Sequence, residues 1–128
     1  MIRHFVEFQG KQYGASRREI RVTINKNKVF ILNAKALEAL KNPTYVKLYF
    51  DEPRGLIAMR RCEGGHPNAF LLKNGSKGSY HKALHAAAFC AHFKIHVDHT
   101  TVFLTPRMEG DMLTLDMNKT ATVGRGAR

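Results

Sequence analysis

The chain has 128 residues, of which 21 are Lys or Arg and only 10 are Asp or Glu, so its formal net charge is +11. Hydrophobic residues make up 44% of the sequence and include eight Phe, which is enough for the core of one compact domain and excludes a disordered basic peptide. No apolar run approaches the roughly 18 residues needed to span a bilayer, and the first residues lack the apolar stretch of a secretory signal, so we expect a cytoplasmic protein.

The first predicted elements form a hairpin. Ile20, Val22 and Ile24 alternate with polar residues, and this period of two predicts a half-buried strand. Residues 25–28 are polar and typical of a turn, and the apolar residues 29–32 then predict a second strand.

A short helix and a second hairpin are predicted next. Asn33 is a favourable N-cap because its side chain can accept a hydrogen bond from a free backbone N–H. Residues 34–40 favour a helix, and Pro43 prevents it from continuing. Two strands are expected at residues 46–50 and 56–62, joined by a turn at residues 53–55 that contains Pro and Gly.

The second half of the chain faintly resembles this build, although chance similarity of two α+β segments explains the resemblance equally. Residues 69–72 predict a short strand, and residues 80–93, with five alanines, predict the longest helix. A last hairpin is expected to join residues 101–104 to residues 112–117 through a turn at residues 109–111.

These elements predict an α+β fold. We expect two units, each with a β-hairpin and a helix, that pack together through mainly antiparallel strands, with one longer helix at about residues 80–93. Residues 1–117 would form a single domain, built from the units 20–62 and 69–117, and residues 118–128 would form a basic tail.

The order strand, strand, short helix, strand, strand runs through IRVTINKNKVFILNAKALEALKNPTYVKLYFDEPRGLIAMRRC, which is residues 20–62. This segment resembles the AbrB-like swapped-hairpin family of transcription factors, although Lys28 and Asn33 stand where that family usually has Gly and Pro. The resemblance implies a homodimer with interleaved hairpins, in which Arg21, Lys26 and Lys28 lie near DNA. The whole chain also resembles small uncharacterised bacterial or phage proteins.

The excess of cations predicts a polyanionic partner, because neutralising phosphates releases counterions whatever the fold. Arg21 lies on the polar face of the first strand, and we expect it to project with the turn lysines toward phosphates; a solvated charged face is the alternative. The predicted primary contacts are Arg17, Arg18, Arg21, Lys26 and Lys28, and the predicted secondary contacts are Lys77, Arg125 and Arg128.

Residues 75–78 form a GxxG sequence of the kind with which KH domains hold an RNA backbone, although an ordinary turn also fits. On a helix over residues 80–93, His81, His85 and His92 would share one face, and His81 and His85 would have the spacing of a metal pair. A solvated helix face is the alternative interpretation. Cys62 and Cys90 are expected to be free thiols.

We therefore predict a non-enzymatic, homodimeric nucleic-acid-binding protein without a cofactor, with DNA favoured over RNA and a regulatory or nucleoid-type role. Two alternatives stay open. One is a phage or bacterial assembly protein that binds an acidic protein partner. The other is a small basic ribonuclease that acts through His81, His85 and Lys82.

Overall fold

The structure is a computed structural model that describes residues 19–75 and 80–123. Within these ranges the chain forms ten strands and two short helices. The strands are β1 (Val22–Ile24), β2 (Val29–Leu32), β3 (Tyr45–Asp51), β4 (Leu56–Cys62), β5 (Phe70–Asn74), β6 (Lys82–His85), β7 (Thr101–Phe103), β8 (Arg107–Glu109), β9 (Met112–Asp116) and β10 (Thr120–Thr122). The helices are α2 (Ala34–Ala39) and α3 (Ala87–Phe93).

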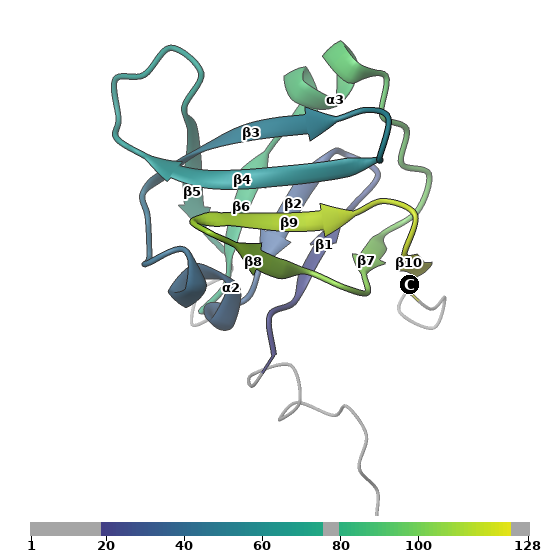
Figure 1. The fold of residues 1–128 in the computed structure, drawn as a ribbon, viewed down its shortest axis with the longest axis horizontal. Helices are drawn as coiled ribbons and strands as arrows, with labels where there is room; N and C mark the ends of the chain where they lie inside the picture. Colours follow the sequence, from purple (N-terminus) through teal and green to yellow (C-terminus); the bar gives the residue numbers. More distant parts are fainter. Residues whose placement is uncertain (1–18, 76–79, 124–128) are drawn as a thin grey trace, which may run out of the picture.

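The strands form one antiparallel sheet in the order β10-β7-β1-β2-β6-β5-β3-β4-β9-β8. The sheet curls back on itself, so that β3, β4, β9 and β8 (the front half) lie in front of β1, β2, β6 and β7 (Figure 1). Strand β5 makes the corner, because residues 70–71 pair with β3 and residues 72–74 pair with β6.

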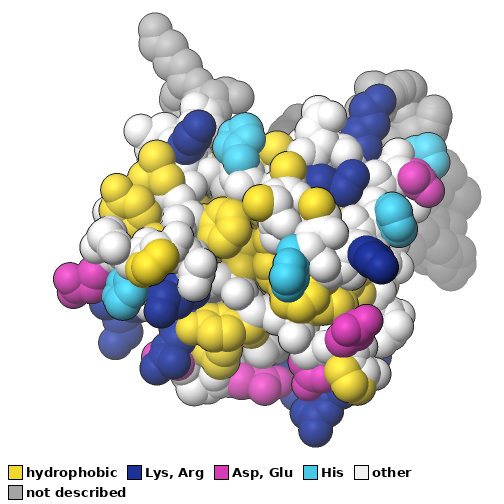
Figure 2. Space-filling model, turned by 90° about the horizontal axis from the view of Figure 1, so that it is seen from above, with side chains coloured by type: hydrophobic (Ala, Val, Ile, Leu, Met, Phe, Trp, Pro, Cys, Tyr) yellow, Lys and Arg dark blue, Asp and Glu magenta, His cyan; other side chains and the backbone are white. Residues whose placement is uncertain are grey.

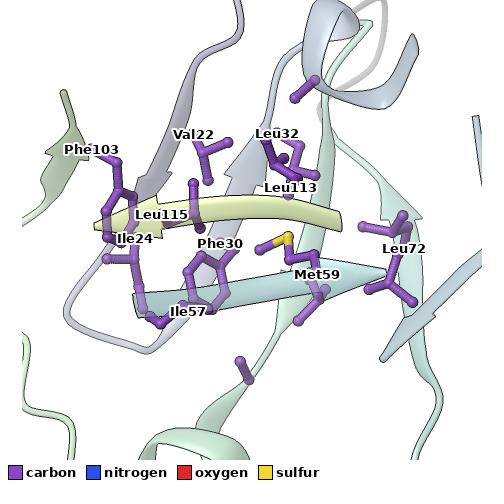
Figure 3. Close-up of a cluster of buried hydrophobic side chains, with 14 of the residues drawn as sticks. Val22, Ile24, Phe30, Leu32, Ile57, Met59, Leu72, Phe103, Leu113 and Leu115 are labelled. Atoms are coloured by element: carbon purple, nitrogen blue, oxygen red, sulfur yellow. The ribbon is translucent and has the colours of Figure 1, made fainter. Parts of the chain in front are cut away.

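The hydrophobic core fills the space between the two halves of the curled sheet (Figure 3). Alternate residues of β1, β2 and the first part of β4 are buried, as the period of two predicts. Full burial of each such side chain stabilises the fold by about 1.5–3 kcal/mol relative to exposure to water. The back half contributes Val22, Ile24, Phe30 and Leu32, and the front half contributes Ile57, Met59, Leu113 and Leu115, all of which are at most 2% exposed.

The two helices lie at opposite ends of the curled sheet (Figure 1). Helix α2 begins at the predicted cap, where the Asn33 side chain accepts a hydrogen bond from the backbone N–H of Ala36 at 2.9 Å. Helix α3 closes the other end through a cluster of aromatic rings, with the ring of Phe50 lying 6.4 Å from that of Phe89 and 5.1 Å from that of Phe93.

The α+β prediction is wrong, because the described chain is mostly antiparallel β structure with only two short helices. The predicted long helix at residues 80–93 accounts for most of the error. Its first part is strand β6, which pairs with β2 on one side and β5 on the other, and only the second part is helix α3. Pairing on both edges and full burial of Leu84 outweigh the helix preference of the alanines.

The predicted pairing of residues 101–104 with residues 112–117 is also wrong. The turn at Gly110 is where the sequence predicts it, but β9 turns there onto β8, whereas β7 pairs with β1 and β10. Strand β10 carries the sheet into the segment that was predicted to be a basic tail.

The five elements predicted within residues 20–62 occur in the predicted order. Their two hairpins do not pair with each other, because β1 and β2 belong to the back of the sheet and β3 and β4 to the front. The resemblance to the AbrB-like family stays a prediction.

Candidate nucleic-acid interface

The structure separates the predicted basic contacts that it describes. Arg21 is exposed just before β1, whereas Lys26 and Lys28 belong to the β1–β2 turn at the other end of that strand. Residues 21–25 alone span roughly 13 Å in an extended strand, so these cations do not form one compact group. The other predicted contacts, Arg17, Arg18, Lys77, Arg125 and Arg128, lie outside the described residues.

The described residues carry less than half of the net positive charge of the chain. They hold 14 of the 21 Lys and Arg and nine of the 10 Asp and Glu, so the remaining seven cations and one acid belong to the other residues. Around α3, the Lys and Arg side chains spread over the margin of the surface, among histidines and carboxylates (Figure 2). Charge density alone therefore does not identify a binding surface on the described residues, and specific arrangements of side chains are needed to identify one.

His81, His85 and His92 do not share one helix face, because residues 80–93 do not form a single helix. His85 is on β6 and His81 lies just before it, so four residues of extended chain, or roughly 13 Å, separate them. His92 lies on α3. Among the described residues, no three His, Cys, Asp or Glu side chains are placed to hold a metal ion. Both cysteines are free thiols, as predicted.

A different group of side chains lies together on the outer surface of β3 and β4. Along β3, Tyr45, Lys47 and Tyr49 alternate with residues that point into the core, so all three point outward. Arg60 of β4 is the direct cross-strand partner of Lys47 and points the same way. We name these four residues the tyrosine face; strands β3 and β4 lie at the front of the molecule, with neither helix drawn over them (Figure 1).

The two rings are partly exposed and are held by neighbouring groups. The ring of Tyr45 packs against Gly64, where an added Cβ would lie only 2.7 Å from a ring carbon. Tyr49 is 37% exposed, and its side chain lies near enough to Arg60 to contribute to raising the pKa of that guanidinium group. Leu71, the cross-strand partner of Tyr45 on β5, extends the apolar surface and is 42% exposed.

The cations of this face are an unfavourable pair in isolation. Lys47 and Arg60 lie directly opposite each other, where side chains are about 4.5–5.5 Å apart at Cβ and like charges repel. Asp111, in the β8–β9 turn, relieves part of this repulsion by accepting a hydrogen bond from Nε of Arg60 at 2.8 Å. This hydrogen bond and the negative charge of Asp111 raise the pKa of Arg60, and the nearby Tyr49 side chain raises it further.

Lys47 makes no ion pair with any described residue. Carboxylates do lie on the same surface, at Asp51 on β3 and Asp116 on β9, toward the far ends of these strands. The arrangement therefore offers anions one local site, at the Lys47–Arg60 pair, and offers flat apolar groups the two rings beside it.

Part of this face was visible in the sequence. The alternation at residues 45–50 puts Lys47 and Tyr49 on the polar side of the strand, but that pattern alone describes any half-buried strand. The register of β3 against β4 singles out Arg60 as the partner of Lys47, and Arg61 points to the other side. No local signal in the sequence gives this register or the contact of Tyr45 with Gly64.

Comparisons with protein-family models, curated proteins and solved structures gave no match. Neither of the helices in residues 19–75 and 80–123 has the length and apolar character needed to cross a membrane. The function of this chain is therefore inferred from its own side chains.

Proposed function

We propose that this protein binds nucleic acid, without catalysing a reaction, through the tyrosine face. The observation that carries this proposal is the direct pairing of Lys47 with Arg60 between two outward-pointing tyrosines. A phosphate group placed over the pair would remove the repulsion between the two cations and accept charge-assisted hydrogen bonds from both. The formal net charge of +11 adds a long-range attraction for the same ligand.

We propose DNA as the natural nucleic acid and a regulatory or nucleoid-type role in the cytoplasm. The resemblance of residues 20–62 to a family of transcription factors supports this choice and also supports a homodimer. Arg21, Lys26 and Lys28 would then make additional contacts with the phosphate backbone, away from the tyrosine face.

The first prediction concerns Lys47. In a fluorescence-anisotropy titration with a labelled oligonucleotide, we expect affinity to fall steeply between about 50 and 200 mM salt. Lys47→Gln should weaken binding several-fold and lower the slope of log K against log salt by about 0.7–0.9, the contribution of one phosphate contact. Lys119→Gln is the matched control, since Lys119 is an exposed lysine in the β9–β10 turn.

Binding that does not respond to salt, or equal losses in both lysine variants, would overturn the proposal. Failure to retain any nucleic acid at low salt would instead favour the assembly protein with an acidic protein partner.

A further inference from the structure

We infer that the ligand of the tyrosine face is single-stranded nucleic acid, with bases stacked on the rings of Tyr45 and Tyr49. This inference rests on the proposed function and names the form of nucleic acid that the face accepts. The preference for a single strand follows from the two tyrosine rings, whereas the proposed binding of nucleic acid follows from the pairing of Lys47 with Arg60.

The spacing along β3 suits an extended strand of nucleotides. Tyr45, Lys47 and Tyr49 are successive outward residues, and such residues are about 6.7 Å apart along a strand. Lys47 therefore has a tyrosine at the next outward position on either side, and Arg60 lies opposite it on the next strand. A backbone that crosses the face can place a phosphate at the cations and a base over each ring.

The rings can stack only on bases that are not already stacked on both sides. In a duplex each base is covered by its neighbours and shows only its edges to the grooves, whereas bases of a single strand can turn outward onto aromatic side chains. Flat stacking surfaces beside a cationic site are the recurring means by which proteins bind single strands without strong sequence preference.

Both rings contact neighbouring groups of the sheet in the absence of a ligand. The Tyr45 ring packs against Gly64, where even an added Cβ would clash with it, and the Tyr49 side chain lies near Arg60. A side chain that is already in place loses little conformational entropy on binding. Pre-positioned rings therefore favour stacking over a looser electrostatic attachment.

Part of the exposed apolar surface of the described chain lies here. Four large hydrophobic side chains of the described chain are exposed, namely Tyr49, Leu71, Tyr80 and Leu104. Leu71 of β5 lies directly opposite Tyr45, and Tyr49 points outward from the same face of β3, two outward positions further along the strand. Apolar area that lies next to unpaired positive charge fits a base attached to a phosphate better than it fits a phosphate alone.

The test uses the full chain and three labelled probes at one salt concentration: a single strand of thymidines, a duplex of equal length, and a strand of the same backbone without bases. We expect the wild-type protein to bind the single strand at least about tenfold more tightly than either other probe. Tyr45→Leu and Tyr49→Leu should each weaken binding of the single strand about 5- to 100-fold and leave binding of the baseless strand unchanged.

Two further variants control for folding and for ring chemistry. Tyr45→Phe keeps a stacking surface and should bind the single strand nearly as tightly as wild type. Tyr80→Leu removes an exposed tyrosine that is 83% exposed and lies outside the tyrosine face, and it should change nothing.

Equal affinity for all three probes, with no loss in the Leu variants, would overturn the inference while leaving the proposed function intact. Absence of salt-sensitive binding to every probe would overturn both. If a Leu variant fails to fold, the preference of the wild-type protein among the three probes and the behaviour of Tyr45→Phe still decide the question.

Discussion

Arg60 forms an ion pair with Asp111, and this ion pair has consequences for the proposed binding. A phosphate that approaches the Lys47–Arg60 pair meets Asp111, whose Oδ2 lies 2.8 Å from Nε of Arg60. Both side chains of this ion pair are half exposed, so solvent screens their attraction and the pair adds little to the stability of the fold. If phosphate binds at this pair as proposed, Asp111 competes with it for Arg60.

The effect of removing this competitor is a prediction at the scale of one residue. Asp111→Asn should tighten binding of a labelled single strand about two- to fivefold and steepen the salt dependence, because Arg60 becomes available to a phosphate. The thermal unfolding midpoint should change little. Glu38→Gln is the control, since Glu38 pairs with Lys35 on α2, away from β3 and β4. Equal affinities for the two variants would contradict the role given to Asp111.

Single residues were predictable from the sequence where the determinant is local. The Asn33 cap depends on residues three positions apart and was predicted correctly. The outward direction of Lys47 and Tyr49 depends only on alternation along one strand. The pairing of Arg60 with Asp111 joins residues 51 positions apart, and no local pattern indicates it.

At the scale of elements, the segment of residues 80–93 shows where local preference fails. Its alanines favour a helix in isolation, yet β6 gains hydrogen bonds from two strands at once. Its partner β2 lies about 50 residues earlier in the chain, so the energy that decides the outcome comes from contacts that a sequence window does not contain. The same is true of β7, whose partners are β1 and β10 and not the strand that follows it.

Helix α3, the part of this segment that is helical, carries a buried thiol with a testable pH dependence. Burial raises the pKa of Cys90 above its ordinary value of 9.0, and the positive charge of Lys28 opposes this rise only in part. The unfolded chain therefore loses the thiol proton at lower pH than the folded chain does. It follows that the free energy of unfolding falls as the pH rises above about 9, by at most about 1.4 kcal/mol per pH unit for one proton.

Urea unfolding of wild type and Cys90→Ala at a series of pH values measures this effect. We expect the wild-type protein to lose more stability than the variant above pH 9, and Cys90→Ala to be about 1 kcal/mol less stable at neutral pH because a buried sulfur is removed. Parallel curves for the two proteins at high pH would show that the thiol remains protonated in both states or ionises in both.

At the scale of the whole molecule, the surplus of cations predicts attraction to polyanions but not the place where they bind. The described residues account for less than half of the net charge, and their four ion pairs neutralise some of the cations that remain. The register of the curled sheet instead places two cations and two rings from β3 and β4 on one outer surface, which is the proposed interface. The proposed class of partner thus rests on composition, and the proposed surface rests on the pairing of strands.

The central claim is that nucleic acid binds at the tyrosine face, and NMR spectroscopy of the ¹⁵N-labelled full chain during titration with a single-stranded oligonucleotide tests it most directly. We expect the largest shifts at the backbone amides of β3, β4 and the neighbouring part of β5, with the tyrosine ring signals shifting upfield as bases stack on them. Shifts confined to Arg21 and the β1–β2 turn, with β3 and β4 unchanged, would contradict the claim and return the interface to the basic hairpin that the sequence alone suggests.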